Sequence, residues 1–456
     1  MNKIKQYLKA IDGVSHTTFN PNGPGSVRVH LIPPKKIKLG VPWVIILNGQ
    51  DIIPISCGWA ILLREFINLV NKTDGKSLSD DEVKALIDNT ITNVKKVFKR
   101  TNKTLLKDDL RDIVNILADV AEGKEPKTEI GFMRLKQYGK HMSAPHRMDL
   151  MISSMFKNNH WHCNQKCIHC YAGEQEYAIK EELTTDQWKQ IIDTLKEARI
   201  PQVTFTGGEP TLRDDLVELV DYSKWFVTRL NTNGVLLTKD LCEKLYNASL
   251  DSVQVTLYSN NEKIHNLLVG ANNFQKTIEG IKNARDAKLN ISVNTPLCTI
   301  NKDYVSLIEY LHKELGVQYF TCSGLIVTGN AVEDNSQETQ LSKEELTDVL
   351  TKACEYINEH DLDINFTSPG WIDESVLKQL KLNTPSCGAC LSNMAIAPNG
   401  DVIPCQSWLS NDSLGNLLNS NWKEIWKNKK CKQIRKMSMK TDNVCPLTSK
   451  NKKEVK

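Results

Sequence analysis

Three cysteines, Cys163, Cys167 and Cys170, fall within eight residues of the chain. No helix or strand presents three side chains at this spacing on one face, so the sequence predicts a loop. A closed structural zinc site takes four ligands, and a disulfide takes two. Three thiolates suit an iron–sulfur cubane whose fourth iron stays open to a substrate or cofactor. The spacing therefore predicts a reactive metal site.

A second motif, Thr206-Gly207-Gly208-Glu209-Pro210, ends the next apolar, β-branched run. Its two glycines allow the backbone to approach a ligand closely. The carboxylate of Glu209 accepts hydrogen bonds from an ammonium group. Taken together, CxxxCxxC and GGEP resemble the signature motifs of the radical SAM superfamily.

This resemblance implies a reductive cleavage of S-adenosylmethionine to a 5′-deoxyadenosyl radical, which abstracts hydrogen from a substrate. A [4Fe-4S] cluster with an open iron would chelate the amino and carboxylate groups of S-adenosylmethionine. An electron donor such as flavodoxin or ferredoxin is implied as a partner. The family's motifs assign the cluster to Cys163, Cys167 and Cys170, and the cofactor to His169, Gly207, Gly208, Glu209, Thr256 and Asn294.

Strands and helices are expected to alternate from residue 146 to residue 370. Such alternation predicts a parallel sheet with right-handed crossovers. The predicted fold class is α/β, a partial (β/α)6 TIM-like barrel with active-site residues at the carboxyl ends of its strands. Cys322 is expected near one strand end, facing the barrel mouth, where substrate contact is a minor alternative to burial. The strands are expected at 150–155, 202–206, 226–231, 252–258, 290–295, 318–322 and 363–366, and the helices at 185–199, 238–248, 273–288, 302–315 and 342–359.

A second group of cysteines lies in residues 371–448, around a predicted hairpin with its turn at Pro398–Asp401. The order of cysteines and glycine resembles the SPASM and twitch extensions of radical SAM enzymes, although a full SPASM extension has further closely spaced cysteines. The resemblance implies one auxiliary iron–sulfur cluster, with zinc or no metal as alternatives. Cys431 is expected to be a helix residue and not a ligand. The expected ligands are Cys387, Cys390, Cys405 and Cys445.

Residues 1–125 are expected to form a small α+β domain, followed by a linker at 126–145. Strands at 28–32, 41–47 and 52–55 precede three helices, with Asn48-Gly49 as a hairpin turn and Ser79 with Glu82 as a capping box. This order resembles winged-helix-like peptide-recognition modules, which bind a peptide as an added strand. A domain that merely packs on its neighbour is the alternative, and nucleic-acid binding is disfavoured.

Composition is that of an ordinary globular protein, with a net charge of +4 and 40% apolar residues. The sequence shows neither a secretory signal nor a membrane-spanning apolar run. The 13 cysteines therefore indicate metal ligands in a cytoplasmic protein more than disulfides. The lysine-rich tail at 449–456 is expected to be disordered.

The leading hypothesis is a radical SAM enzyme that modifies a ribosomally made peptide or a protein. A radical SAM enzyme acting on a small molecule, such as a tetrapyrrole side chain, is the second hypothesis. A non-catalytic iron–sulfur or zinc scaffold is the third, and the complete set of Cys163, Cys167, Cys170 and Glu209 argues against it.

Overall fold

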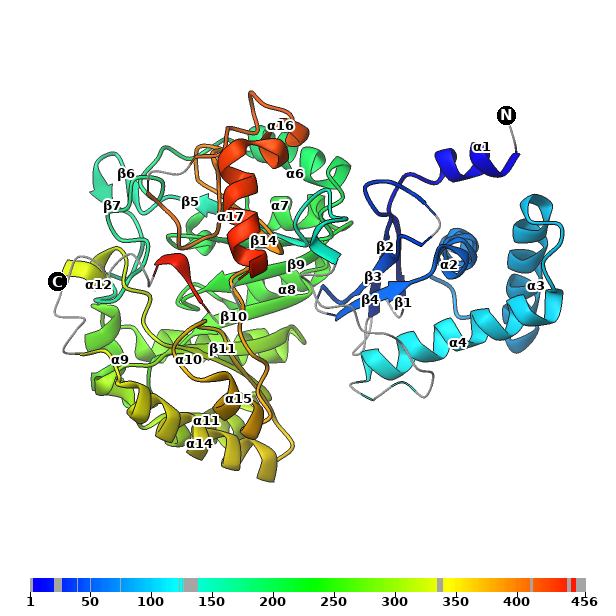
Figure 1. Ribbon diagram of the computed structural model, residues 1–456. Coiled ribbons are helices and arrows are strands. Elements are labelled where there is room, and N and C mark those ends of the chain that lie inside the picture. Colours follow the sequence, from blue (N-terminus) through cyan, green and yellow to red (C-terminus); the bar gives the residue numbers. More distant parts are fainter. Residues whose placement is uncertain are drawn as a thin grey trace. The chain divides into compact units, whose positions relative to one another are not determined.

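A computed structural model describes residues 3–19, 27–38, 40–49, 51–73, 75–122, 124, 126, 138–333, 339–410, 413–440 and 444–447. The chain divides into two compact units, Met1–Ala144 and Pro145–Lys456 (Figure 1). The predicted tail at 449–456 lies outside the described residues, as does most of the predicted linker. No described helix combines the length and the apolar character that crossing a bilayer requires.

The N-terminal unit is a four-stranded antiparallel sheet, in the order β1-β2-β3-β4, followed by helices. The strands are β1 Ser15–Phe19, β2 Val27–Ile32, β3 Trp43–Leu47 and β4 Asp51–Ile55. The helices are α1 Lys3–Ala10, α2 Cys57–Val70, the 3-10 turn η1 Asn71–Thr73, α3 Asp80–Val97 and α4 Lys103–Ala121. Three strands and three helices match the predicted order, whereas α1 and β1 were not predicted from the sequence.

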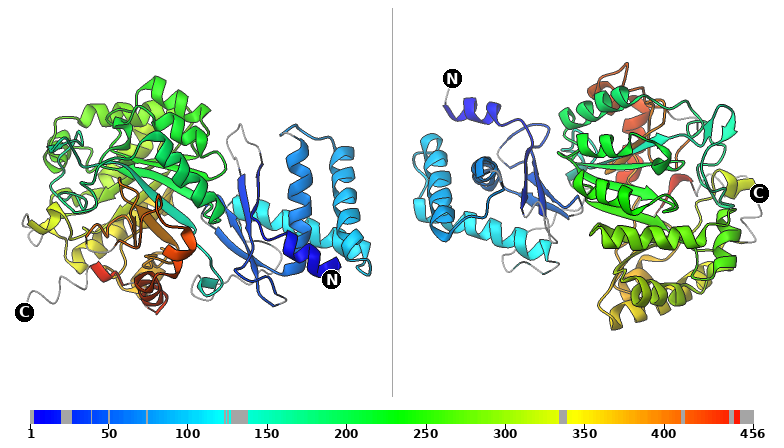
Figure 2. Two further views of the ribbon diagram at one scale, coloured as in Figure 1. Left: turned by 90° about the horizontal axis from the view of Figure 1, so that it is seen from above. Right: turned by 180° about the vertical axis from the view of Figure 1, so that it is seen from behind.

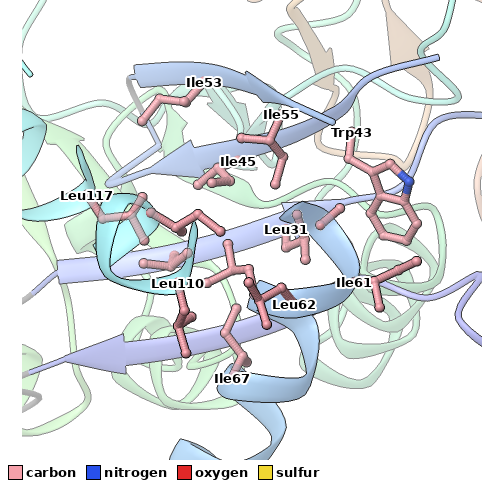
Figure 3. Packing of buried hydrophobic residues seen from close by; sticks show 14 of the residues in the cluster. Leu31, Trp43, Ile45, Ile53, Ile55, Ile61, Leu62, Ile67, Leu110 and Leu117 are labelled. Atoms are coloured by element: carbon pink, nitrogen blue, oxygen red, sulfur yellow. The ribbon is translucent and has the colours of Figure 1, made fainter. Parts of the chain in front are cut away.

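Local sequence signals account for much of this unit. Asn48 and Gly49 both have positive φ (50° and 70°), as a two-residue hairpin turn between β3 and β4 requires. The predicted capping box is confirmed, with Ser79 and Glu82 hydrogen-bonded to each other's backbone nitrogens. Side chains from one face of the sheet pack against α2 and α4 in a single apolar core (Figure 3).

The second unit is built on a nine-stranded sheet in the order β13-β12-β11-β10-β9-β8-β5-β14-β15. Its strands are β5 Arg147–Ser153, β8 Gln202–Gly207, β9 Val227–Thr232, β10 Ser252–Thr256, β11 Asn290–Pro296, β12 Tyr319–Ser323, β13 Asp363–Phe366, β14 Asn393–Ile396 and β15 Val402–Ile403. A separate hairpin pairs β6 Phe156–Lys157 with β7 His160–Trp161. The run from β5 to β13 is parallel, which confirms the predicted α/β fold class.

Helices connect the parallel strands and lie along the outer side of the curved sheet (Figure 2). They are α6 Thr185–Glu197, η2 Pro210–Leu212, α7 Leu216–Tyr222, α8 Lys239–Asn247, α9 Glu262–Val269, α10 Phe274–Asp286, η3 Thr299–Asn301, α11 Tyr304–Leu315, α12 Asn330–Glu333 and α14 Lys343–Glu359. The C-terminal helices are α15 Glu374–Gln379, α16 Trp422–Lys427 and α17 Lys429–Lys440. The five predicted helices are present, and α7 and α9 are additional.

The sheet stays open, because β13 ends it on one side and β15 on the other. The predicted C-terminal hairpin forms, and β14 also pairs in parallel with β5. The segment that carries the second cysteine group is therefore continuous with the barrel sheet. This pairing was not predicted, since neither strand's own sequence specifies its neighbour.

The ends of β5 and β8 approach each other unusually closely. A Cβ atom on Gly207 would lie 2.3 Å from the carbonyl oxygen of Ser153, and one on Gly208 would lie 2.8 Å from that of Ser154. Gly207 also has a φ of 140°, which L side chains rarely adopt. The sequence predicted that these glycines admit a ligand. The structure shows that they also admit the neighbouring strand.

We expect Gly207→Ala to lower the free energy of unfolding by about 3 kcal/mol or more, because strain and a backbone clash act together. Gly316→Ala is a matched control, since Gly316 has a φ of 69° but a Cβ atom there would meet only Arg285 Cδ, at an ordinary contact distance of 3.8 Å. Gly316→Ala should lower the free energy of unfolding by about 1 kcal/mol, because only the backbone conformation is unfavourable. Chemical denaturation measures both values, and equal costs for the two variants would contradict the close approach.

Candidate functional site

The three-cysteine stretch is an irregular loop, as predicted, and it lies after the β6–β7 hairpin. Two backbone hydrogen bonds attach it to α9, from Lys166 N to Val269 O (2.9 Å) and from Ile168 N to Leu268 O (3.0 Å). This hairpin separates the loop from β5, the first strand of the barrel, and was not predicted from the sequence. The loop is therefore fixed by a helix that the sequence analysis did not identify.

The thiols of Cys163, Cys167 and Cys170 are not in disulfides. Burial raises the pKa of Cys163 to about 12 and also raises the pKa values of Cys167 and Cys170. Cys167 also interacts electrostatically with both other thiols and with Glu209, which raises its pKa further. These four acidic groups thus share one enclosed site. Ionising several of these groups together would be unfavourable, because their negative charges repel one another. The cationic iron core of a bound cluster would neutralise that repulsion.

No three His, Cys, Asp or Glu side chains among the described residues converge on a point that could hold a single metal ion. A cluster does not require such convergence, because each thiolate binds a different iron. Two buried polar atoms at the same site, Ser153 Oγ and Asn164 Nδ2, have no hydrogen-bond partner within the described residues. The donor types and these two atoms fit a bound cluster and a polar cofactor.

Glu209 lies next to the cysteine loop, since Cys163 Sγ is 3.6 Å from the carbonyl oxygen of Gly208. Its carboxylate is 1% exposed. Oε1 accepts hydrogen bonds from Thr211 N (3.0 Å), Thr211 Oγ1 (2.5 Å) and Thr232 Oγ1 (2.6 Å). Oε2 accepts one from Asn233 N at 2.8 Å.

Burial raises the pKa of Glu209, and its hydrogen-bond donors act in the opposite direction. A carboxylate oxygen has two lone-pair sites, so Oε2, with a single donor, keeps capacity for another. Asn233 also connects the two motifs, because its Nδ2 donates to Asn164 Oδ1 at 2.6 Å. The sequence analysis identified Glu209 but gave no role to Thr232, the last residue of β9, or to Asn233, which follows it.

Thr256 and Asn294 are register partners near the carboxyl ends of β10 and β11. On the same face as Thr256, Gln254 Nε2 donates to Thr321 Oγ1 at 3.0 Å, which marks the polar face of the sheet. His169 is 8% exposed, and its Nε2 lies 2.9 Å from Thr339 Oγ1. The structure thus puts Thr256 and Asn294 side by side on neighbouring strands.

Cys322 lies on the opposite face of β12 from Thr321. It is fully buried, hydrogen-bonded to Tyr304 of α11 and close to Cys354 of α14. The expectation that Cys322 faces the barrel mouth is therefore wrong. A one-residue difference in strand register reverses the direction of a side chain, and the apolar run gave no alternation to fix it.

The second cysteine group gathers around the β14–β15 hairpin. Cys405 interacts electrostatically with Cys387 and Cys445, and Cys390 with Cys405. Cys431 also belongs to this group, since it is fully buried and hydrogen-bonded to Cys390. The hydrogen bond from Cys390 lowers the pKa of Cys431, and a nearby guanidinium acts in the same direction.

Comparison with family models identifies two domains. Residues 162–311 match the radical SAM superfamily, and residues 387–447 match the iron–sulfur cluster-binding domain known as SPASM. The first match contains the three-cysteine loop and the GGEP turn. The second contains the cysteines around the hairpin. The first implies a [4Fe-4S] cluster and S-adenosylmethionine, and the second implies auxiliary iron–sulfur clusters.

Among curated proteins, the AdoMet-dependent heme synthase of Methanosarcina barkeri is 27% identical over 283 residues, 58% of this chain and 79% of the relative. The mycofactocin maturase MftC of Mycolicibacterium smegmatis is 28% identical over 273 residues, 58% of this chain and 67% of the relative. Both relatives carry the names of enzymes, which supports an enzymatic role for this chain, and the products in those names differ.

Among solved structures, Streptococcus suis SuiB bound to precursor peptide SuiA matches with a TM-score of 0.58 and 16% identity, over 87% of each chain. That share exceeds the Pro145–Lys456 unit, so the fold likeness includes part of the N-terminal unit. The chain therefore carries a radical SAM domain and, C-terminal to it, a SPASM domain.

Proposed function

We propose that this enzyme cleaves S-adenosylmethionine at the three-cysteine loop and modifies a ribosomally made peptide or a protein. The observation that carries the first part is the contact between the two motifs, with Cys163 Sγ 3.6 Å from Gly208 O. When bound, a reduced cluster would supply the electron for reductive cleavage of S-adenosylmethionine, and the cofactor would supply the hydrogen-abstracting chemistry.

The chain's own residues hold and orient these groups. Cys163, Cys167 and Cys170 would hold the cluster, and Glu209 Oε2 would receive the amino group of S-adenosylmethionine. Thr256 and Asn294 would face its ribose or carboxylate, and His169 would lie beside its adenine. Enclosure of the site excludes water, which would otherwise quench or divert the reaction.

A peptide or protein substrate is supported by the N-terminal unit. Strand β4 forms one edge of its sheet, and an extended peptide adds to such an edge through backbone hydrogen bonds. Ile53 and Ile55 of β4 are buried in the core, whereas Ile52 and Pro54 are half-buried on the other face. The likeness to MftC and SuiB supports the same reading.

A small-molecule substrate remains the second candidate, because the heme synthase relative matches the chain over a similar length. The two candidates share the radical chemistry and differ in the role of Met1–Ala144. A peptide substrate needs that unit for capture. A tetrapyrrole does not.

Replacing Cys163, Cys167 or Cys170 by Ala should abolish formation of 5′-deoxyadenosine, because the cluster loses one of only three protein ligands. The measurement is chromatography of anaerobically reconstituted enzyme treated with S-adenosylmethionine and a strong reductant. Cys57→Ala, at the start of α2, is the control and should retain activity. Cleavage at the unaltered rate in any of the three variants would reject the assignment.

Glu209→Gln should weaken binding of S-adenosylmethionine by about tenfold or more, because a hydrogen bond to a charged group contributes roughly 1.5–3 kcal/mol. Equilibrium dialysis with the reconstituted enzyme measures the dissociation constant. Glu243→Gln changes an exposed carboxylate on α8 and should leave binding unchanged. Equal affinity of the Glu209 variant and the wild type would exclude an ammonium contact at Oε2.

If short peptides are encoded beside this gene, co-expression with them should give a peptide whose altered mass is detected by mass spectrometry. The change should disappear with Cys163→Ala, which removes the radical chemistry. Ile52→Lys should lower the modified fraction while 5′-deoxyadenosine formation continues, because a lysine on an edge strand disfavours added strands. Unmodified peptides, together with turnover of a tetrapyrrole, would favour the small-molecule candidate.

A further inference from the structure

Helix α17 presents one face to the second cysteine group. Cys431, Arg435 and Ser438 lie at positions i, i+4 and i+7, which share a side of a helix. Ser438 Oγ donates to the carbonyl oxygen of Ala389 at 2.8 Å and lies 3.7 Å from Cys387 Sγ, in the loop of residues 387–390. This contact fixes the helix face against the loop.

Cys431 is surrounded by groups that suit a ligand. Its side chain is fully buried and hydrogen-bonded to the equally buried Cys390. Arg435 Nη2 lies 3.4 Å from its sulfur. A cysteine that only fills an apolar core needs neither a second thiol nor a guanidinium beside it.

The guanidinium of Arg435 is held in place from two sides. Its Cζ atom lies 3.5 Å from the ring centroid of Trp426, and Nη2 donates to the Trp426 carbonyl oxygen at 2.6 Å. It interacts electrostatically with the sulfurs of Cys431 and Cys390. A half-buried cation needs a negative partner, and here that partner is sulfur.

We propose that Cys431 is a ligand of the auxiliary cluster, with Cys387, Cys390 and Cys405, and that Arg435 holds a positive charge beside that cluster. The inference rests on the iron–sulfur chemistry of the SPASM domain. Five thiols gather at this site, whereas a [4Fe-4S] cluster takes four. Cys445 also interacts with Cys405, but it is half-buried, whereas Cys431 is fully buried beside Cys390. We therefore assign the fourth position to Cys431 and leave Cys445 outside the set. This revises the set predicted from sequence, which included Cys445.

The role of Arg435 follows from charge. A cluster with four thiolate ligands is an anion, and reduction makes it more negative. A fixed cation nearby stabilises the reduced form more than the oxidised form, so it raises the reduction potential. Arg435 is thus a positioning residue whose effect can be measured without substrate.

Iron content of the anaerobically reconstituted full chain tests the ligand. Wild type should bind about eight irons, and Cys431→Ala about four, since one cluster of two is lost. Cys445→Ala should keep about eight. Cys431→Ala with about eight irons and an unchanged spectrum would overturn the inference. If the wild-type protein itself binds only about four irons, it holds no auxiliary cluster, and the inference fails with it.

The state of the cluster at Cys163–Cys170 shows whether a Cys431 variant has lost only a ligand or has failed to fold. In both Cys431→Ala and the nearly isosteric Cys431→Ser, addition of S-adenosylmethionine should still change the electron paramagnetic resonance signal of the cluster at Cys163–Cys170. Loss of both clusters in the two variants would show that Cys431 supports the fold and would overturn a ligand role.

Redox titration followed by electron paramagnetic resonance tests Arg435. Arg435→Gln should keep about eight irons and lower the midpoint potential of the auxiliary cluster. Arg435→Lys keeps the charge and should lower it less. An unchanged midpoint in Arg435→Gln would overturn the role of the guanidinium.

Discussion

The close approach of β5 and β8 at their carboxyl ends is the constraint on which the site depends. Gly207 and Gly208 leave room for the backbone of Ser153 and Ser154, and any side chain there would separate the strands. With the strands in contact, Gly208 O reaches Cys163 Sγ, and Glu209 enters the same enclosed site. Two motifs far apart in sequence thus become one site through a contact between backbones.

The cysteine loop adds a second constraint, because irregular backbone must find hydrogen-bond partners elsewhere. Helix α9 supplies two of them. Near α12, Asn330 N donates to Cys170 O at 2.9 Å, and Asn330 Nδ2 donates to Cys167 O at 3.1 Å. Gly270 and Gly329, both with positive φ, allow these segments to reach the loop. The loop is therefore held by two segments that come later in the chain.

The sequence predicted the alternation of strands and helices because each buried strand and each amphipathic helix carries its own periodic signal. It also located Cys163, Cys167, Cys170 and Glu209, whose types and spacing are unusual. It missed Thr232 and Asn233, since a Thr-Asn-Gly turn has the same composition whether or not it holds a carboxylate. Cys431 lies on a helix, as expected, but its own helix gave no sign of its neighbour Cys390, which comes from the loop before β14.

The two cysteine sites differ in the sign of the charge beside them. The first adjoins the buried carboxylate of Glu209, whose negative charge opposes adding an electron nearby. The second adjoins Arg435, whose positive charge favours it. On reduction, a cluster bound at the second site would therefore be stabilised by its neighbouring residue, whereas one bound at the first would be opposed by it. The fold thus gives its two cysteine groups opposite local charges by placing one carboxylate and one guanidinium.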